Sequence, residues 1–554
     1  MALWDEISIE PAERKLLIAF GGTGLGIMAL GGVFALVMLL IRTPALAVLS
    51  PNFFYQAITG HAIMMFIFWL GFVQTALLIA AGTVLAGRRL WSYKLAWVGF
   101  SLMATAALLA LAGILLGANI TYHAAVPLAK QYSAAWLIYL SFIVFALGML
   151  AVVVDFAWTI FGAVERKLSL ANWADFFAQL PIASFAAVAG LLIAVPGLIA
   201  AIKAFVPALL WTLGYVSIDP NAYRLHWHIA FHIYHYMPAL ALVGVAYVLV
   251  EATTGAKSVY AKQVAKALFL LYPFFVPPTF VYHLLVDPNL AYDVKFVGTI
   301  LSLLVGVPTV LHMFIILGML EARMRGAGHG FVGWLRRLPW GNPAFGSMIV
   351  GMITLFVGGL LSYVLIQGQL APLLHNTFVV PAYIHPMAAG GANIMYMGAL
   401  YYGVPALLKR RLWGSGVARV QPYMMGAALL LMSAFGTGAG LAGVPRRYAS
   451  FFGDTPESWT TWMNLSLGVG GMLAMVAGVL FVLIMVMTAF AGWKVATLAD
   501  AVAGTGAFSV AIKREYGRTP TALIPSSVFV ITVIIATLWT FGVIWALPMQ
   551  LQLR

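Results

Sequence analysis

The sequence predicts an all-α polytopic membrane protein of about 13 transmembrane helices, on three observations. The 554-residue chain has a mean hydropathy of +0.99 and only 8% charged residues, too few to solvate a water-soluble domain of this length. Its apolar residues fall in repeated runs of about 20 or more, each long enough to cross about 30 Å of hydrocarbon as a helix. Its basic residues concentrate in alternate loops between these runs.

The apolar runs define the expected spans. They lie at 15–42, 55–86, 92–117, 133–164, 180–213, 225–252, 264–286, 294–321, 346–369, 377–408, 420–441, 461–491 and 525–549. No run is followed by a linker long enough to mark a second domain, so we expect a single transmembrane domain over residues 1–554. The segment before the first run carries Asp5, Glu6 and Glu10, which argues against a cleaved signal peptide.

The loop charges predict the orientation. One set of alternate loops holds most basic residues: Arg88, Arg89, Lys94, Arg166, Lys167, Lys257, Lys262, Lys266, Arg323, Arg325, Arg336, Arg337, Lys409, Arg410, Arg411, Arg419, Lys494, Lys513, Arg514 and Arg518. The opposite loops hold few, mainly Arg42, Lys130, Arg224, Lys295, Arg446 and Arg447. Because cytoplasmic loops carry the excess of Lys and Arg, the N-terminus is expected in the cytoplasm and the C-terminus outside. The net charge of +14 therefore reflects topology, and we expect no nucleic acid partner.

Histidines are the main candidates for metal ligands, because the chain has no cysteine and thiolate sites are therefore excluded. At about 1.5 Å per residue from each outer span end, His61, His232, His283 and His385 fall in one layer of the outer third of the membrane. For a lone histidine, a helix–helix hydrogen bond would be explanation enough. Four at one depth indicate metal or haem ligation, because a polar group in hydrocarbon is costly and imidazole is a common ligand.

Four patterns carry a family resemblance. They are YQAITGHAIMMF (55–66), FHIYHYMPA (231–239), YHLLVDPN (282–289), and HNTFVVPAYIHP (375–386) taken together with GVPRRYASF (443–451). In order and spacing they resemble subunit I of the haem–copper oxidases, and the likeness runs nearly end to end. Tyr234 stands where the A family has a glutamate two residues after a copper-binding histidine, which favours the B family of bacteria and archaea.

The resemblance implies a low-spin haem. Its axial ligands would be His61 and His385, and the outer-loop pair Arg446 and Arg447 would hold its propionates, since a guanidinium pairs with a carboxylate through two hydrogen bonds. The alternative for the two arginines is contact with lipid phosphate at the membrane surface.

The resemblance also implies an oxygen-reducing centre, and the chain departs from the family pattern there. His232 and His283 would bind copper, and Tyr236, one helical turn beyond His232, would be the catalytic tyrosine, which the family cross-links to a copper-binding histidine. The family has histidines at two further positions, where this chain has Tyr282 and Tyr383. Both departures fall on the oxygen-reducing centre, and neither touches the low-spin haem.

Three interpretations of this centre stay open. In the first, Tyr383 ligates a second haem as a phenolate, and Tyr282 or another side chain completes the copper site. Further candidates for this third copper ligand are His228, His235 and His312. In the second, the site holds another metal, as in nitric-oxide-reducing relatives that use iron, although no acidic residue lies beside His232. In the third, the centre is lost and a paralogue keeps the low-spin haem alone.

Hydroxyl groups on facing spans are candidates for a proton path from the cytoplasm. They belong to Tyr236, Tyr247, Ser302 and Thr309. The alternative is that these hydroxyls only bond to neighbouring backbone.

The function implied is the haem-bearing large subunit of a respiratory terminal oxidase, a cytochrome c or quinol oxidase. It would pass electrons through a low-spin haem to an oxygen-reducing centre with proton uptake. The alternative is an electron-transfer or structural subunit that keeps only the low-spin haem. The cofactors implied are the low-spin haem, a second haem and copper. The partners implied are other oxidase subunits including a subunit II, a cytochrome, copper protein or quinol as donor, and membrane lipid, in the plasma membrane of a bacterium or archaeon.

Overall fold

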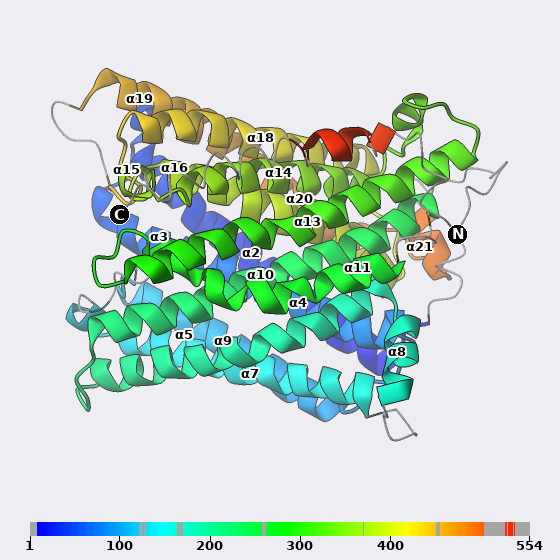
Figure 1. The fold of residues 1–554 in the computed structure, drawn as a ribbon, viewed down its shortest axis with the longest axis horizontal. Coiled ribbons are helices and arrows are strands. Elements are labelled where there is room, and N and C mark those ends of the chain that lie inside the picture. The colour runs from blue at the N-terminus through cyan, green and yellow to red at the C-terminus, as the bar shows by residue number, and fades with distance from the viewer. Residues whose placement is uncertain are drawn as a thin grey trace.

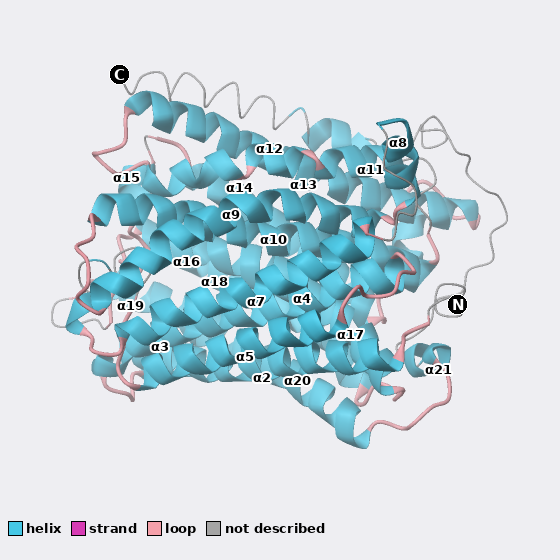
Figure 2. Cartoon of the chain, turned by 90° about the horizontal axis from the view of Figure 1, so that it is seen from below, coloured by secondary structure: helices cyan, strands magenta, loops and turns pink. Residues whose placement is uncertain are grey.

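Long helices running side by side make up the computed structural model of the chain (Figure 1). The structure describes residues 8–120, 126, 129–162, 170–256, 262–368, 370–449, 455–503, 527–528, 530–535 and 537. Within these residues the elements are helices joined by loops, and no strand is formed (Figure 2). The predicted all-α fold is therefore confirmed.

Ten helices of the described chain are long and apolar enough to cross a membrane. They are α2 (Pro11–Arg42), the continuous helix Pro51–Leu85 that contains α3 and α4, α5 (Tyr93–Leu115), α7 (Ala135–Phe161), α9 (Ile182–Thr212), α10 (Pro220–Thr254), α13 (Tyr292–Gly326), α14 (Pro343–Leu365), α18 (Ser415–Leu441), and the helix Glu457–Ala491 that contains α19 and α20. Each begins and ends within a few residues of a predicted run, because the length of an apolar run is set by the hydrocarbon that it must cross.

Two further predicted runs form helices that are not straight α-helices. The run at 264–286 becomes α11 (Lys262–Phe269), α12 (Leu271–Phe275) and η7 (Pro277–Leu284), with a bend of 52° before η7. Pro277 and Pro278 explain the bend, because neither can donate a backbone hydrogen bond. The run at 377–408 becomes α16 (Val379–Ile384), the π-helix η9 (His385–Asn393) and α17 (Ile394–Leu408).

The thirteenth predicted span, 525–549, falls mostly outside the described residues, so the count of 13 and the external C-terminus stay predictions. The same holds for the N-terminal segment before residue 8. Other residues of the sequence analysis outside the described part are Arg166, Lys167, Lys257, Lys513, Arg514 and Arg518.

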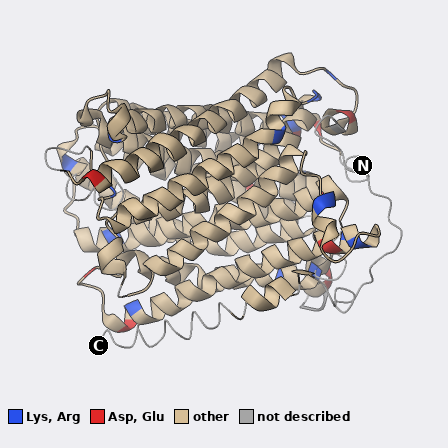
Figure 3. Cartoon of the chain, turned by 90° about the horizontal axis from the view of Figure 1, so that it is seen from above, with Lys and Arg blue, Asp and Glu red and all other residues tan. Residues whose placement is uncertain are grey.

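Charged side chains gather at the two ends of the bundle, and the tan middle of the described chain carries few (Figure 3). The helices α8 (Leu170–Gln179), α11 and α21 (Leu498–Ala503) lie at one end, whereas α15 (Ala371–Leu374), α16 and α19 (Glu457–Met463) lie at the other (Figure 1). At the first end, two of the predicted basic loops are in contact. The backbone of Arg411, in the loop after α17, donates to Trp493 O, in the loop after α20, at 2.9 Å. This grouping agrees with the predicted alternation of loops.

Close packing fixes α16 and η9 against α14. A Cβ atom added to Gly358 of α14 would lie 2.6 Å from Met387 N and 2.8 Å from Tyr383 O, both backbone atoms. Small residues at helix contacts let backbones approach in this way inside a membrane. The helix that carries Tyr383 and His385 therefore has no room to move toward α14 at this point.

Replacing Gly358 with alanine should lower the unfolding free energy by about 1–3 kcal/mol, because an added methyl group in a filled contact forces the backbones apart. The neighbouring Gly359 meets nothing within 4 Å, so Gly359→Ala is a matched control that should keep or slightly raise stability. Thermal unfolding of the purified protein in detergent measures both. Equal midpoints for the two variants would contradict the close approach.

Candidate functional site

Two of the predicted ligands, His61 and His385, face each other across a gap. His61 lies on α3 (Phe54–Ala62), and His385 is the first residue of η9. Their ring planes are 7° from parallel and their ring centres are 6.4 Å apart. Nδ1 of His61 lies 3.1 Å from Gly31 O, and Nδ1 of His385 lies 2.8 Å from Pro381 O. Since a carbonyl oxygen only accepts, each Nδ1 carries the proton and each Nε2 is left as a ligand.

This geometry fits a haem iron. Two imidazoles on opposite faces of one metal, each bonded at about 2.0–2.1 Å, have ring centres about 6.3 Å apart. The two rings match that separation, and their Nδ1 atoms make the backbone hydrogen bonds that usually orient ligand histidines. A π-helix also begins at or just after each histidine, at Ile63 and at His385. Such segments are frequent at functional sites.

The second pair of predicted ligands, His232 on α10 and His283 on η7, is in direct contact. Nδ1 of His232 lies 3.3 Å from Nε2 of His283. The other nitrogen of His232 contacts Oγ1 of Thr279, and that hydroxyl donates to Val276 O at 2.8 Å. Thr279 therefore accepts from His232 Nε2–H, which leaves His232 Nδ1 unprotonated toward His283. Two nitrogens bonded at about 2.0–2.1 Å to one tetrahedral metal lie about 3.3–3.4 Å apart, so the pair fits two ligands of a metal ion.

A third ligand of the usual type does not complete this pair. Among the described residues, no group of three His, Cys, Asp or Glu side chains is placed to hold a metal. Of the predicted substitutes, the ring of His228 lies 5.5 Å from that of His283. His235 is held between the rings of Phe66 and Phe231, at 4.0 and 4.3 Å.

Three tyrosines surround the second pair, and together with His232 and His283 they form what we call the Tyr–His cluster: Tyr236, Tyr282 and Tyr383. The ring of Tyr236 lies 4.9 Å from that of His232, and the ring of Tyr282 lies 3.9 Å from that of His283. Tyr383 lies near enough to both Tyr236 and Tyr282 to interact with them electrostatically. The structure therefore brings together all five residues predicted for the oxygen-reducing centre.

The loop that carries Arg446 and Arg447 is held by a residue that the sequence analysis did not assign to the site. Arg42, the last residue of α2, is only 5% exposed. It donates to Arg446 O at 2.7 Å and to Pro445 O, and its guanidinium lies 4.8 Å from the ring centre of Phe378. The sequence shows that Arg42 ends the first span, but it carries no signal that this side chain is buried against the loop of Arg446.

His375 lies beside Arg446 at the same end of the bundle. Burial and then the positive charge of Arg446 lower the pKa of His375 to about 4. Its imidazole is therefore neutral at neutral pH. The backbone of Arg446 donates to Asn376 O at 3.0 Å, so the loop of Arg446 lies against the segment that leads into α16.

The proposed proton-path residues form separate contacts. Tyr247 OH lies 3.0 Å from Nδ1 of His312, and Thr309 Oγ1 lies 2.7 Å from the hydroxyl of Tyr272, which the sequence analysis had not named. Ser302 bonds only to backbone oxygens, at 2.7 Å to Gly298 O and 3.4 Å to Thr279 O. His312 thus belongs with Tyr247 and not with the His232–His283 pair.

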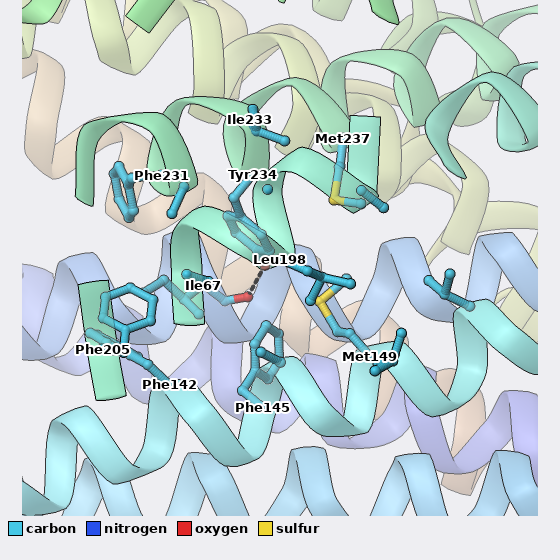
Figure 4. A pocket seen from close by; sticks show the side chains of 17 residues that line it. Ile67, Phe142, Phe145, Met149, Leu198, Phe205, Phe231, Ile233, Tyr234 and Met237 are labelled. Atoms are coloured by element: carbon cyan, nitrogen blue, oxygen red, sulfur yellow. Dashed lines mark hydrogen bonds between the residues drawn. The ribbon is translucent and has the colours of Figure 1, made fainter. Parts of the chain in front are cut away.

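An apolar cavity of about 100 Å³ lies among α7, α9 and α10 (Figure 4). Figure 4 shows Tyr234 in its wall, with its hydroxyl bonded to Ile67 O at 2.5 Å. Its other labelled residues are aliphatic, aromatic or methionine side chains, and neither His232 nor His283 lines it. The cavity therefore offers no polar anchor for a cofactor.

Comparison with known proteins points to one family. Residues 15–473 match the family described as Cytochrome C and Quinol oxidase polypeptide I. A cytochrome c oxidase subunit 1 of Thermus thermophilus is 31% identical over 262 residues, which are 45% of this chain and 44% of that protein. The chain thus matches less than half the length of this relative. A cytochrome c oxidase subunit 1 of Albinaria turrita is 33% identical over 141 residues, which are 24% of this chain and 67% of that one.

The fold has a close structural counterpart. A chain of a heme-copper terminal oxidase dimer, solved by cryo-EM, superimposes with a TM-score of 0.79. The match covers 96% of this chain and 92% of the other at 21% sequence identity. At that identity the match shows a shared fold alone.

Replacing Arg42 with lysine should lower the unfolding free energy by about 1.5–3 kcal/mol, because an ammonium cannot reproduce both hydrogen bonds of the guanidinium. Arg89→Lys is the control, since that side chain is 77% exposed. Thermal unfolding in detergent measures both variants. An Arg42→Lys protein as stable as the control would show that Arg42 does not anchor the loop.

Proposed function

Because the chain belongs to the cytochrome c and quinol oxidase polypeptide I family, we propose that it is the haem-bearing large subunit of a respiratory terminal-oxidase complex. Members of this family are transmembrane oxidoreductases of the respiratory chain with haem and copper centres. In our proposal, His61 and His385 hold a low-spin haem through which electrons pass. The parallel rings with centres 6.4 Å apart are the observation that carries this proposal.

The chain's own residues would prepare this site for electron transfer. A haem with two imidazole ligands supplies a one-electron carrier whose potential depends on its ligands and surroundings. Gly31 O and Pro381 O fix the tautomer and direction of the two rings. Arg446 and Arg447 would pair with the propionates, on a loop that Arg42 holds in place. Rigid ligands and paired charges keep the site unchanged when an electron arrives, which favours rapid transfer.

Oxygen reduction at the Tyr–His cluster is the first candidate for the use of these electrons. The 3.3 Å between Nδ1 of His232 and Nε2 of His283 supports it, because this separation fits two ligands of one copper ion. Tyr236 would then be the catalytic phenol, close to His232. This candidate also needs a second haem with Tyr383 as its ligand, and protons brought through the hydroxyls near Tyr247 and Thr309.

An electron-transfer subunit without oxygen reduction is the second candidate. The tyrosines at positions 282 and 383 support it, because the family resemblance implies histidine ligands of the oxygen-reducing centre at both positions. In this case the haem on His61 and His385 would be the only redox centre of the chain.

The composition of the chain limits its partners in this proposal. With no cysteine, the chain has no thiolate-held dinuclear copper, so electrons would come from a subunit II, a cytochrome, a copper protein or a quinol at the outer face. The proposed location is the plasma membrane of a bacterium or archaeon, as a multi-pass protein with its N-terminus in the cytoplasm.

The variants His61→Ala and His385→Ala should each lose the low-spin haem, because the one remaining imidazole cannot keep the iron six-coordinate. The visible spectrum and the haem content per chain measure this. His329→Ala, in a basic loop distant from the layer of ligands, is the control and should keep wild-type haem. A His385→Ala protein with the unchanged low-spin spectrum would refute the assignment of this ligand.

A further inference from the structure

A hydrogen bond between Trp69 and Asn393 joins the two helices that carry the His61–His385 pair. Nε1 of Trp69 donates to Oδ1 of Asn393 at 2.7 Å. Trp69 is the last residue of the π-helix η3 (Ile63–Trp69), and Asn393 is the last residue of the π-helix η9. Both residues are buried, with exposures of 0% and 3%. Each π-helix therefore leads from a ligand histidine to one partner of this hydrogen bond.

The two partners lie equally far along their helices from the ligand histidines. Trp69 follows His61 by eight residues, and Asn393 follows His385 by eight. The two helices run in the same direction, from α3 to α4 and from α16 to α17 (Figure 2). At about 1.5 Å per residue, the hydrogen bond lies about 12 Å from the ligand pair along both helices. The space between the helices is thus bounded by two imidazoles at one end and by this bond at the other.

The chemistry of the pair makes the bond resistant to breaking. An indole N–H can only donate, so the amide oxygen of Asn393 faces Trp69. If the bond broke, a buried donor and a buried acceptor would be left unpaired in an apolar interior, which is costly. The bond therefore opposes both separation and rotation of η3 relative to η9.

Close contacts attach each π-helix to a different neighbouring helix. A Cβ atom added to Gly31 of α2 would lie 2.6 Å from the side chain of Met65 in η3, and one added to Gly390 of η9 would lie 2.5 Å from the side chain of Thr354 in α14. The same Gly31 supplies the carbonyl that orients His61. The Trp69–Asn393 bond thus joins two packed units, α2 with η3 and α14 with η9, and each unit fixes one imidazole.

We infer that Trp69 and Asn393 are positioning residues of the haem site, whose hydrogen bond sets the rotation of η3 relative to η9. Since Nδ1 of His385 is bonded to Pro381 O of its own helix, its ring turns when the helix turns. The bond thereby keeps the two imidazole planes 7° from parallel. The inference rests on the low-spin haem of the proposed function and adds the residues that set its ligand geometry.

Electron paramagnetic resonance of the ferric protein tests the inference, because the g values of a low-spin ferric haem depend on the angle between its two imidazole planes. The wild type, purified as the full chain with any accompanying subunits, should give the g values of parallel planes. Trp69→Phe keeps a buried ring and removes the N–H donor, so its largest g value should shift toward that of crossed planes. Asn393→Leu should give the same shift, whereas Asn393→Asp keeps an accepting oxygen and should keep the wild-type g values.

Tyr401→Phe is the matched control. The hydroxyl of this buried residue of α17 donates to Oε1 of Gln421 at 2.9 Å, so the control also loses one buried side-chain hydrogen bond. It should lose stability and keep the wild-type g values. Wild-type g values in both Trp69→Phe and Asn393→Leu would overturn the inference and leave the proposed haem site standing, as would an equal shift in the control. A wild type without a low-spin ferric signal would refute the proposed function and the inference with it.

Discussion

The need to pair every polar group in a nearly charge-free bundle determines how this chain presents its imidazoles. An unpaired N–H in hydrocarbon is costly, and His385 pairs its Nδ1 with a carbonyl of its own helix four residues earlier. His228 does the same with Arg224 O at 2.6 Å. Each such bond sets the tautomer and leaves Nε2 directed away from the helix. An imidazole whose Nδ1–H is paired in this way already presents Nε2 as a ligand. One hydrogen bond therefore both pairs a polar group inside the membrane and orients the ring for a metal.

His232 meets the same constraint differently. No carbonyl of its helix is its partner, and Thr279 of η7 accepts from its Nε2 instead. Thr279 is in position because Pro277 and Pro278 bend the preceding helix by 52°. The bend thus sets which nitrogen of His232 is left for His283. This explains why the second pair uses Nδ1 of one ring and Nε2 of the other, with 3.3 Å between them.

The sequence predicted what depends on composition and depth. Hydrocarbon thickness sets the length of each apolar run, so the sequence predicted the bounds of ten spans to within a few residues. The shared depth of four histidines predicted one layer, and the family resemblance paired His61 with His385. The sequence did not predict features that depend on contacts between segments far apart in the chain. The burial of Arg42 against Pro445 and Arg446 joins residues about 400 positions apart. The bend at Pro277 was missed because hydropathy is insensitive to the backbone hydrogen bonds that a proline removes.

The two departures from the family's histidine pattern both fall near the His232–His283 pair. A phenol at position 383 alone, facing an imidazole and a porphyrin, would put a longer side chain into filled space. A phenol at position 282 alone would have the same difficulty from the other face. In this structure the ring of Tyr282 lies 3.9 Å from that of His283 and 5.4 Å from that of His232, and Tyr383 packs with Leu365, Val379 and Val380. The His61–His385 pair, where both histidines are kept, instead holds its parallel rings with centres 6.4 Å apart, the separation that a metal between them requires.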